Sequence, residues 1–73
     1  MLFRSGQRDA AIKAYRSATE QHPDFADAWN NLAQALRDAG QREAAAQAIG
    51  KAVVIGGARL ARYLELQRAI ENK

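Results

Sequence analysis

The sequence contains no cysteine and only one proline and one histidine among its 73 residues. Without cysteine, disulfides, thiolate zinc sites and cysteine nucleophiles are excluded within this chain. No apolar run approaches the roughly 20 residues that a membrane-spanning helix needs. The first nine residues, MLFRSGQRD, also lack a signal-peptide pattern. We therefore expect a soluble protein with no membrane partner.

The chain also has no block of charge of one sign. Eleven Lys and Arg stand against eight Asp and Glu, which gives a net charge of +3, but the basic residues are single and acidic residues are interspersed among them. A phosphate-binding face needs clustered positive charge. We therefore expect no nucleic-acid partner.

Residues suited to catalysis or metal binding are sparse. His22 has no Ser or Cys at a helical spacing and no second histidine with which to share a metal. Asp24 and Asp27 could form a carboxylate pair, but helix capping and compensation of the helix dipole explain both more simply. Gly56-Gly57 lacks the preceding strand and the following lysine of a phosphate-binding loop. We predict no catalytic residue, no metal site and no cofactor, and a protein that is not an enzyme.

Alanine-rich amphipathic segments make up most of the chain. Hydrophobic residues account for 48% of the sequence, which favours a folded domain. Apolar residues recur at i, i+3, i+4 and i+7 in four segments, which predicts helices at about 8–21, 25–38, 42–55 and 58–72. Pro23, Gly40 and Gly56-Gly57 separate these segments, and Asp24 is the expected N-cap of the second helix. Because the loops are short, we predict one all-α domain of antiparallel helix hairpins over residues 1–73.

The sequence of one of these helical segments occurs twice in the chain. SGQRDAAIKAY at residues 5–15 returns as AGQREAAAQAI at residues 39–49, so Gly6 corresponds to Gly40 at an offset of 34 positions. Trp29 and Tyr63 form an aromatic pair at the same offset. A repeated helix hairpin leaves an apolar face that the next copy covers.

Paired helices with a 34-residue period resemble the tetratricopeptide repeat, or TPR. Residues 26–59 supply the residues typical of that family, namely Trp29, Leu32, the small residue Ala33, the turn residue Gly40, Ala45 and Ala52. The family prefers aromatic residues where Leu36 and Ile49 stand and proline where Gly57 stands. The resemblance implies a fragment of a helical solenoid, in which we expect Trp29 to be the main core residue.

The resemblance also implies how the chain divides. Residues 1–25 are the end of a partial repeat, with Met1–Arg4 as the last turn of an otherwise missing helix, and residues 26–59 are a complete repeat. Residues 60–73 are a terminal capping helix, because Gln67 stands where a further repeat would need a small residue. The first helix then lacks its partner, and its uncovered side chains would be Leu2, Phe3, Tyr15 and Ala18. Two chains could bury these N-terminal faces against each other as a homodimer.

In TPR proteins the first helix of each pair lines a concave groove, so the resemblance implies a protein or peptide partner, bound as an extended peptide or a partner helix. By register, the groove positions here are Asp27, Asn30, Asn31, Gln34, Arg37 and Asp38 on the second helix, and Ala61, Leu64, Glu65 and Arg68 on the last. Arg8 is expected to lie near a turn, away from the groove. The alternative is a passive structural or regulatory C-terminal appendage of a larger bacterial protein. The stretch GGARLARY weakly resembles the TPR tails of some cysteine peptidases.

Overall fold

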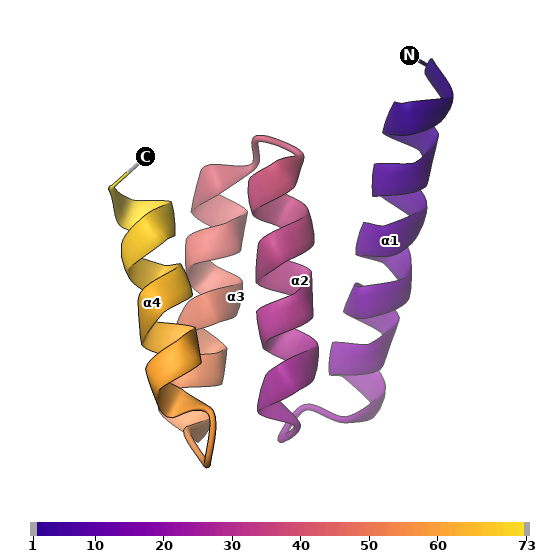
Figure 1. The fold of residues 1–73 in the computed structure, drawn as a ribbon. Coiled ribbons are helices and arrows are strands. Elements are labelled where there is room, and N and C mark those ends of the chain that lie inside the picture. The colour runs from indigo at the N-terminus through magenta and orange to yellow at the C-terminus, as the bar shows by residue number, and fades with distance from the viewer. Residues whose placement is uncertain (1, 73) are drawn as a thin grey trace.

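A computed structural model describes the backbone of residues 2–72 and the side chains of residues 8–72. The described chain forms four helices and no strand: α1 (Leu2–Gln21), α2 (Ala26–Asp38), α3 (Arg42–Ile55) and α4 (Leu60–Glu71). The helices alternate in direction, with α2 in the middle, α1 along one side of it, and α3 and α4 on the other (Figure 1). The prediction of an all-α protein of four antiparallel helices is confirmed.

The turn between α2 and α3 follows from Gly40. This glycine has a φ of 81°, a left-handed conformation that costs other residues free energy. Its N–H donates to the carbonyl of Arg37 at 3.0 Å, and the N–H of Gln41 donates to the carbonyl of Leu36 at 2.9 Å. These two bonds are the Schellman arrangement that ends a helix. They close α2 at the position that the sequence predicts.

The start of α2 differs from the prediction. Phe25, not Asp24, is the N-cap residue, and no side chain caps this helix end. The chain makes a tight turn after α1, in which the N–H of Phe25 donates to the carbonyl of His22 at 3.0 Å. This turn leaves Asp24 one residue too early to reach the free N–H groups of the first helical turn.

The first helix is longer than predicted. α1 runs without a break from Leu2, whereas the repeat register placed a helix end at Met1–Arg4 and a turn at Gly6. Glycine inside a helix costs only about 1 kcal/mol relative to alanine, so Gly6 permits a continuous helix as well as a turn. Met1 and the side chains of Leu2 and Phe3 lie outside the described residues, so the expectation that those two side chains are uncovered stays a prediction.

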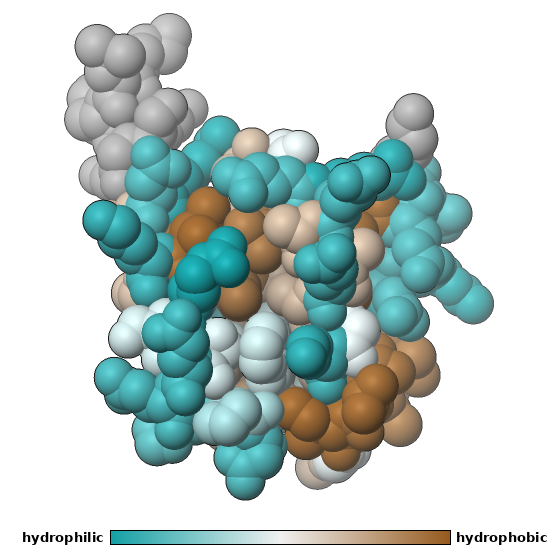
Figure 2. Space-filling view, turned by 180° about the vertical axis from the view of Figure 1, so that it is seen from behind, coloured by the Kyte–Doolittle hydropathy of each residue, from teal (hydrophilic) through white to brown (hydrophobic). Residues whose placement is uncertain are grey.

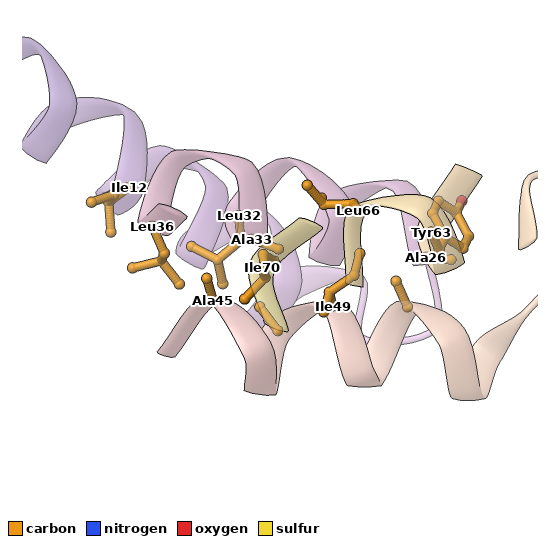
Figure 3. Packing of buried hydrophobic residues seen from close by; sticks show 12 residues of the cluster. Ile12, Ala26, Leu32, Ala33, Leu36, Ala45, Ile49, Tyr63, Leu66 and Ile70 are labelled. Atoms are coloured by element: carbon orange, nitrogen blue, oxygen red, sulfur yellow. The ribbon is translucent and has the colours of Figure 1, made fainter. Parts of the chain in front are cut away.

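The core lies between α2 and α3, with α1 packed against α2 and α4 packed mainly against α3. Three alanines, Ala33, Ala45 and Ala52, have no exposed surface, which indicates that the backbones of α2 and α3 approach closely. The largest fully buried side chains are Leu36, Ile49 and Ile70, one from each of the last three helices. Figure 3 shows these side chains gathered between the helices, with Ile12 of α1 at the margin.

Trp29 is not the main core residue, contrary to the sequence-based expectation. It is only partly buried and packs against the outside of the core cluster. Its Nε1–H donates to the carbonyl of Pro23 at 2.9 Å, and Nζ of Lys51 lies 5.5 Å from the centre of its ring. Because an indole N–H needs an acceptor, the ring lies at the edge, where a loop carbonyl is within reach. Trp29 thereby joins the α1–α2 loop to α2 and α3.

Candidate functional site

Two neighbouring hollows lie beside the exposed ridge of α2. The first, the α1–α2 hollow, has a volume of about 460 Å³. Its wall consists of three residues of α1 and four of α2, namely Arg8, Ala11, Tyr15, Asn31, Gln34, Ala35 and Asp38. The second, the α2–α4 hollow, has a volume of about 390 Å³ and is lined by Asn30, Asn31, Gln34, Arg62, Glu65 and Leu66. Asn31 and Gln34 line both, so the two hollows are adjacent along α2.

The walls of the α2–α4 hollow are mostly polar. Three side-chain amides, those of Asn30, Asn31 and Gln34, come from α2, and each amide can both donate and accept hydrogen bonds. The facing wall carries the guanidinium of Arg62 and the carboxylate of Glu65. This surface can therefore pair with peptide N–H and C=O groups and with charges of either sign.

Some of the predicted groove residues line one of the two hollows, and the others line neither. Asn30, Asn31, Gln34 and Glu65 line the α2–α4 hollow, and Asp38 lines the α1–α2 hollow. The remaining exposed positions lie along α2 and α4 and line neither hollow, namely Arg37, Ala61, Leu64 and Arg68.

The sequence analysis missed several lining residues. Arg8 lines the α1–α2 hollow but not the α2–α4 hollow, because the continuous α1 runs antiparallel to α2 and brings Arg8 alongside the end of α2. Arg62 and Leu66 line the α2–α4 hollow. Arg62 stands three residues before Glu65, and Leu66 stands four residues after Arg62. Residues at these spacings lie on one helix face, so the spacing could have identified both.

Asp27 lies apart from both hollows and makes contacts within the chain. It stands in the first turn of α2, where it accepts a hydrogen bond from the Tyr63 hydroxyl at 2.5 Å and forms an ion pair with Arg59. The hydrogen bond to Asp27, together with burial, raises the pKa of the Tyr63 hydroxyl above its ordinary value. This cluster joins the first turn of α2 to the beginning of α4.

The opposite face of the molecule carries an apolar patch. Val54 is 86% exposed and Ile55 is 38% exposed, both at the end of α3. Figure 2 shows this patch as the brown area at the lower edge of the view from behind. Val54 and Ile55 also line a shallow hollow, together with Pro23, Gln47, Gly50 and Lys51.

Two further findings concern the described residues only. Among them, no three His, Asp or Glu side chains are grouped as a metal ion would require. Their helices are all too short or too polar to cross a membrane.

The model of one protein family, described as the tetratricopeptide repeat, matches residues 2–63 of this chain. Such repeats generally mediate protein–protein interaction and are typically non-catalytic. No curated protein and no solved structure matches the chain. The family match covers most of the sequence and agrees with the four antiparallel helices. The chain therefore belongs to the tetratricopeptide repeat family.

Proposed function

We propose that this chain is a non-catalytic protein–protein interaction module and that its α2–α4 hollow binds an extended peptide of a partner protein. One observation carries the proposal: three side-chain amides of α2, those of Asn30, Asn31 and Gln34, line one hollow together. An extended peptide exposes N–H donors and C=O acceptors along its length, and amide side chains can pair with both.

The facing wall supports the same function. Arg62 and Glu65 are one helical turn apart on α4 and carry opposite charges. The ordinary alternative for such residues is a solvated helix surface, where single polar side chains need no explanation. Here the polar side chains of two helices line a single concave surface, which is the form of a binding site.

We also propose the division into repeats that the sequence suggests, with residues 26–59 as the complete repeat, residues 1–25 as a partial one and residues 60–73 as a capping helix. One observation favours the capping role: Gln67 is partly exposed and Arg68 is exposed, so this side of α4 is polar. The end of α4 is joined to α3 by Arg42, which donates from Nε to the carbonyl of Ile70 at 2.7 Å and from Nη2 to the carbonyl of Glu71 at 2.6 Å.

Selection of peptides from a random displayed library against the 73-residue chain tests the binding function. The affinity of the selected peptides is then measured by fluorescence anisotropy. The double variant Asn30→Ala with Arg62→Ala should weaken binding at least about tenfold, a loss of about 1.4 kcal/mol, with unchanged helicity. Arg37→Ala is the matched control, because Arg37 is exposed and lines neither hollow.

Two outcomes would contradict the proposal. If the double variant binds normally while Val54→Ser abolishes binding, the apolar patch at the end of α3 is the binding surface. If no peptide is selected, the alternative of a passive appendage is favoured over a binding module.

A further inference from the structure

The two walls of the α2–α4 hollow belong to helices that make little contact with each other. α4 packs mainly against α3, and its contact with α2 is the smallest of any pair of touching helices in the described part of the chain. Apolar packing between α2 and α4 therefore does little to fix the distance between the two walls. A polar contact next to the hollow supplies a second connection.

That connection ends on Asp27. Its Oδ1 accepts the hydrogen bond from the Tyr63 hydroxyl at 2.5 Å, and its Oδ2 pairs with Arg59, the residue before α4. The two contacts differ in exposure, because Tyr63 is 3% exposed whereas the Arg59 side chain is 59% exposed. An exposed ion pair contributes little. The hydrogen bond from Tyr63 is therefore the main polar link between α2 and α4.

This hydrogen bond lies beside the hollow. Asp27 stands three and four residues before Asn30 and Asn31 on α2, and Tyr63 stands three residues before Leu66 on α4. Residues at these spacings are neighbours on one helix face. Asn30, Asn31 and Leu66 all line the hollow, whereas Asp27 and Tyr63 do not. The bond therefore joins the two walls one helical turn away from the residues that line them.

We infer that the hydrogen bond between Tyr63 and Asp27 is a positioning contact for the peptide site, which holds the α4 wall at the distance from α2 that lets one peptide touch both. The inference rests on the proposed function. Because neither residue lines the hollow, both act through the side chains that α4 carries into it, those of Arg62 and Glu65. Side chains of a binding site must be held within about 0.5 Å of their productive positions by such supporting contacts.

The test uses a fluorescein-labelled peptide from the library selection, chosen because Asn30→Ala with Arg62→Ala weakens its binding. Anisotropy measures its affinity for variants of the 73-residue chain. Tyr63→Phe should weaken binding at least about threefold, although Tyr63 does not touch the peptide. Asp27→Ala should weaken it similarly, and the double variant should lose little more, because both changes remove the same bond. Asp27→Asn keeps an oxygen acceptor for the Tyr63 hydroxyl and should bind more tightly than Asp27→Ala.

Two comparisons separate positioning from a general loss of stability. Ile12→Val is the control for a weakened core, because Ile12 is buried on α1, which does not contact α4 within the described residues. This variant should bind the peptide as the wild type does, at a temperature at which circular dichroism shows every variant to be folded. In the Arg62→Ala protein, the loss caused by Tyr63→Phe should shrink, because one of the positioned side chains is already absent.

The failure of the inference and the failure of the proposed function give different results. If the peptide binds Tyr63→Phe as tightly as the wild type, or if Ile12→Val weakens binding equally, the inference is overturned and the proposed function stands. An equal loss from Tyr63→Phe with and without Arg62 would also overturn it. If no selected peptide depends on Asn30 and Arg62, the proposed function fails and the inference fails with it.

Discussion

Replacing Tyr63 with phenylalanine tests the contact that joins the beginning of α4 to the first turn of α2. Tyr63 is 3% exposed, and its hydroxyl donates to Oδ1 of Asp27 at 2.5 Å. Tyr63→Phe removes one oxygen atom and leaves the ring, so packing in the core stays nearly unchanged. The variant therefore isolates a single hydrogen bond between α4 and α2.

The expected loss follows from the charge of the acceptor. A hydrogen bond to a charged group contributes about 1.5–3 kcal/mol. Asp27 keeps its ion pair with Arg59 in the variant, so its carboxylate is not left without a partner, and we expect a value near the lower limit. For a domain of this size each 1 kcal/mol lowers Tm by about 4–8 °C. The Tm of Tyr63→Phe should therefore fall by at least about 6 °C.

The effect should depend on pH in one direction. The hydrogen bond to Asp27, then burial and then the negative charge of Asp27 raise the pKa of Tyr63 in the folded protein. A raised folded-state pKa means that folding favours the protonated phenol. Its contribution is fully present below the unfolded-state pKa of about 10 and is lost as the pH rises through the folded-state value. The difference in stability between the wild type and Tyr63→Phe should therefore be constant near neutral pH and shrink above about pH 10.

Urea denaturation followed by circular dichroism measures this difference in stability near neutral pH and above about pH 10. Arg59→Gln is the control, because the Arg59 side chain is 59% exposed and an exposed ion pair contributes only about 0–1 kcal/mol. A Tyr63→Phe protein as stable as the wild type would refute the reasoning. So would a loss that stays the same above about pH 10.

Three further variants test the core and the helix ends by urea denaturation. Leu36→Ala should cost about 2–5 kcal/mol and more than Trp29→Ala, because Leu36 is fully buried and Trp29 is not; the reverse order would restore Trp29 as the main core residue. Arg42→Met should destabilise the chain by about 1 kcal/mol or more and speed hydrogen exchange in the last turn of α4, and unchanged exchange there would contradict the two bonds from Arg42. Gly50→Ala should stabilise the protein by about 1 kcal/mol, because an added Cβ meets no atom within 4 Å; a loss of stability would indicate close packing at Gly50 instead.

The helix ends that local chemistry determines were predictable from the sequence. The predicted bounds of α3 agree with the observed Arg42–Ile55, because Gly40 and Gly56 both adopt positive φ values next to it. The start of α1 was not predictable in the same way. Gly6 repeats the local sequence around Gly40, and such a glycine can lie inside a helix as well as in a turn. A turn at Gly40 is stabilised by the packing of α2 on α3, which no local pattern reports.

The candidate site was predictable in part for a related reason. The register of the family resemblance identified Asn30, Asn31 and Gln34 as groove positions, and all three line one hollow. The contributions of Arg8 and Arg62 come from neighbouring helices. Their positions depend on how those helices are aligned along α2, which is a property of tertiary packing.

Arg8 and Arg42 show why a repeated sequence does not imply a repeated role. They are the same residue at the 34-residue offset, but only Arg42 bonds to helix carbonyls, those of Ile70 and Glu71. The carbonyls that correspond to these near Arg8 belong to Leu36 and Arg37, and both already accept backbone N–H groups from the turn at Gly40. The Arg8 side chain lines the α1–α2 hollow instead. The same arginine therefore bonds to a helix end in one copy and lines a hollow in the other.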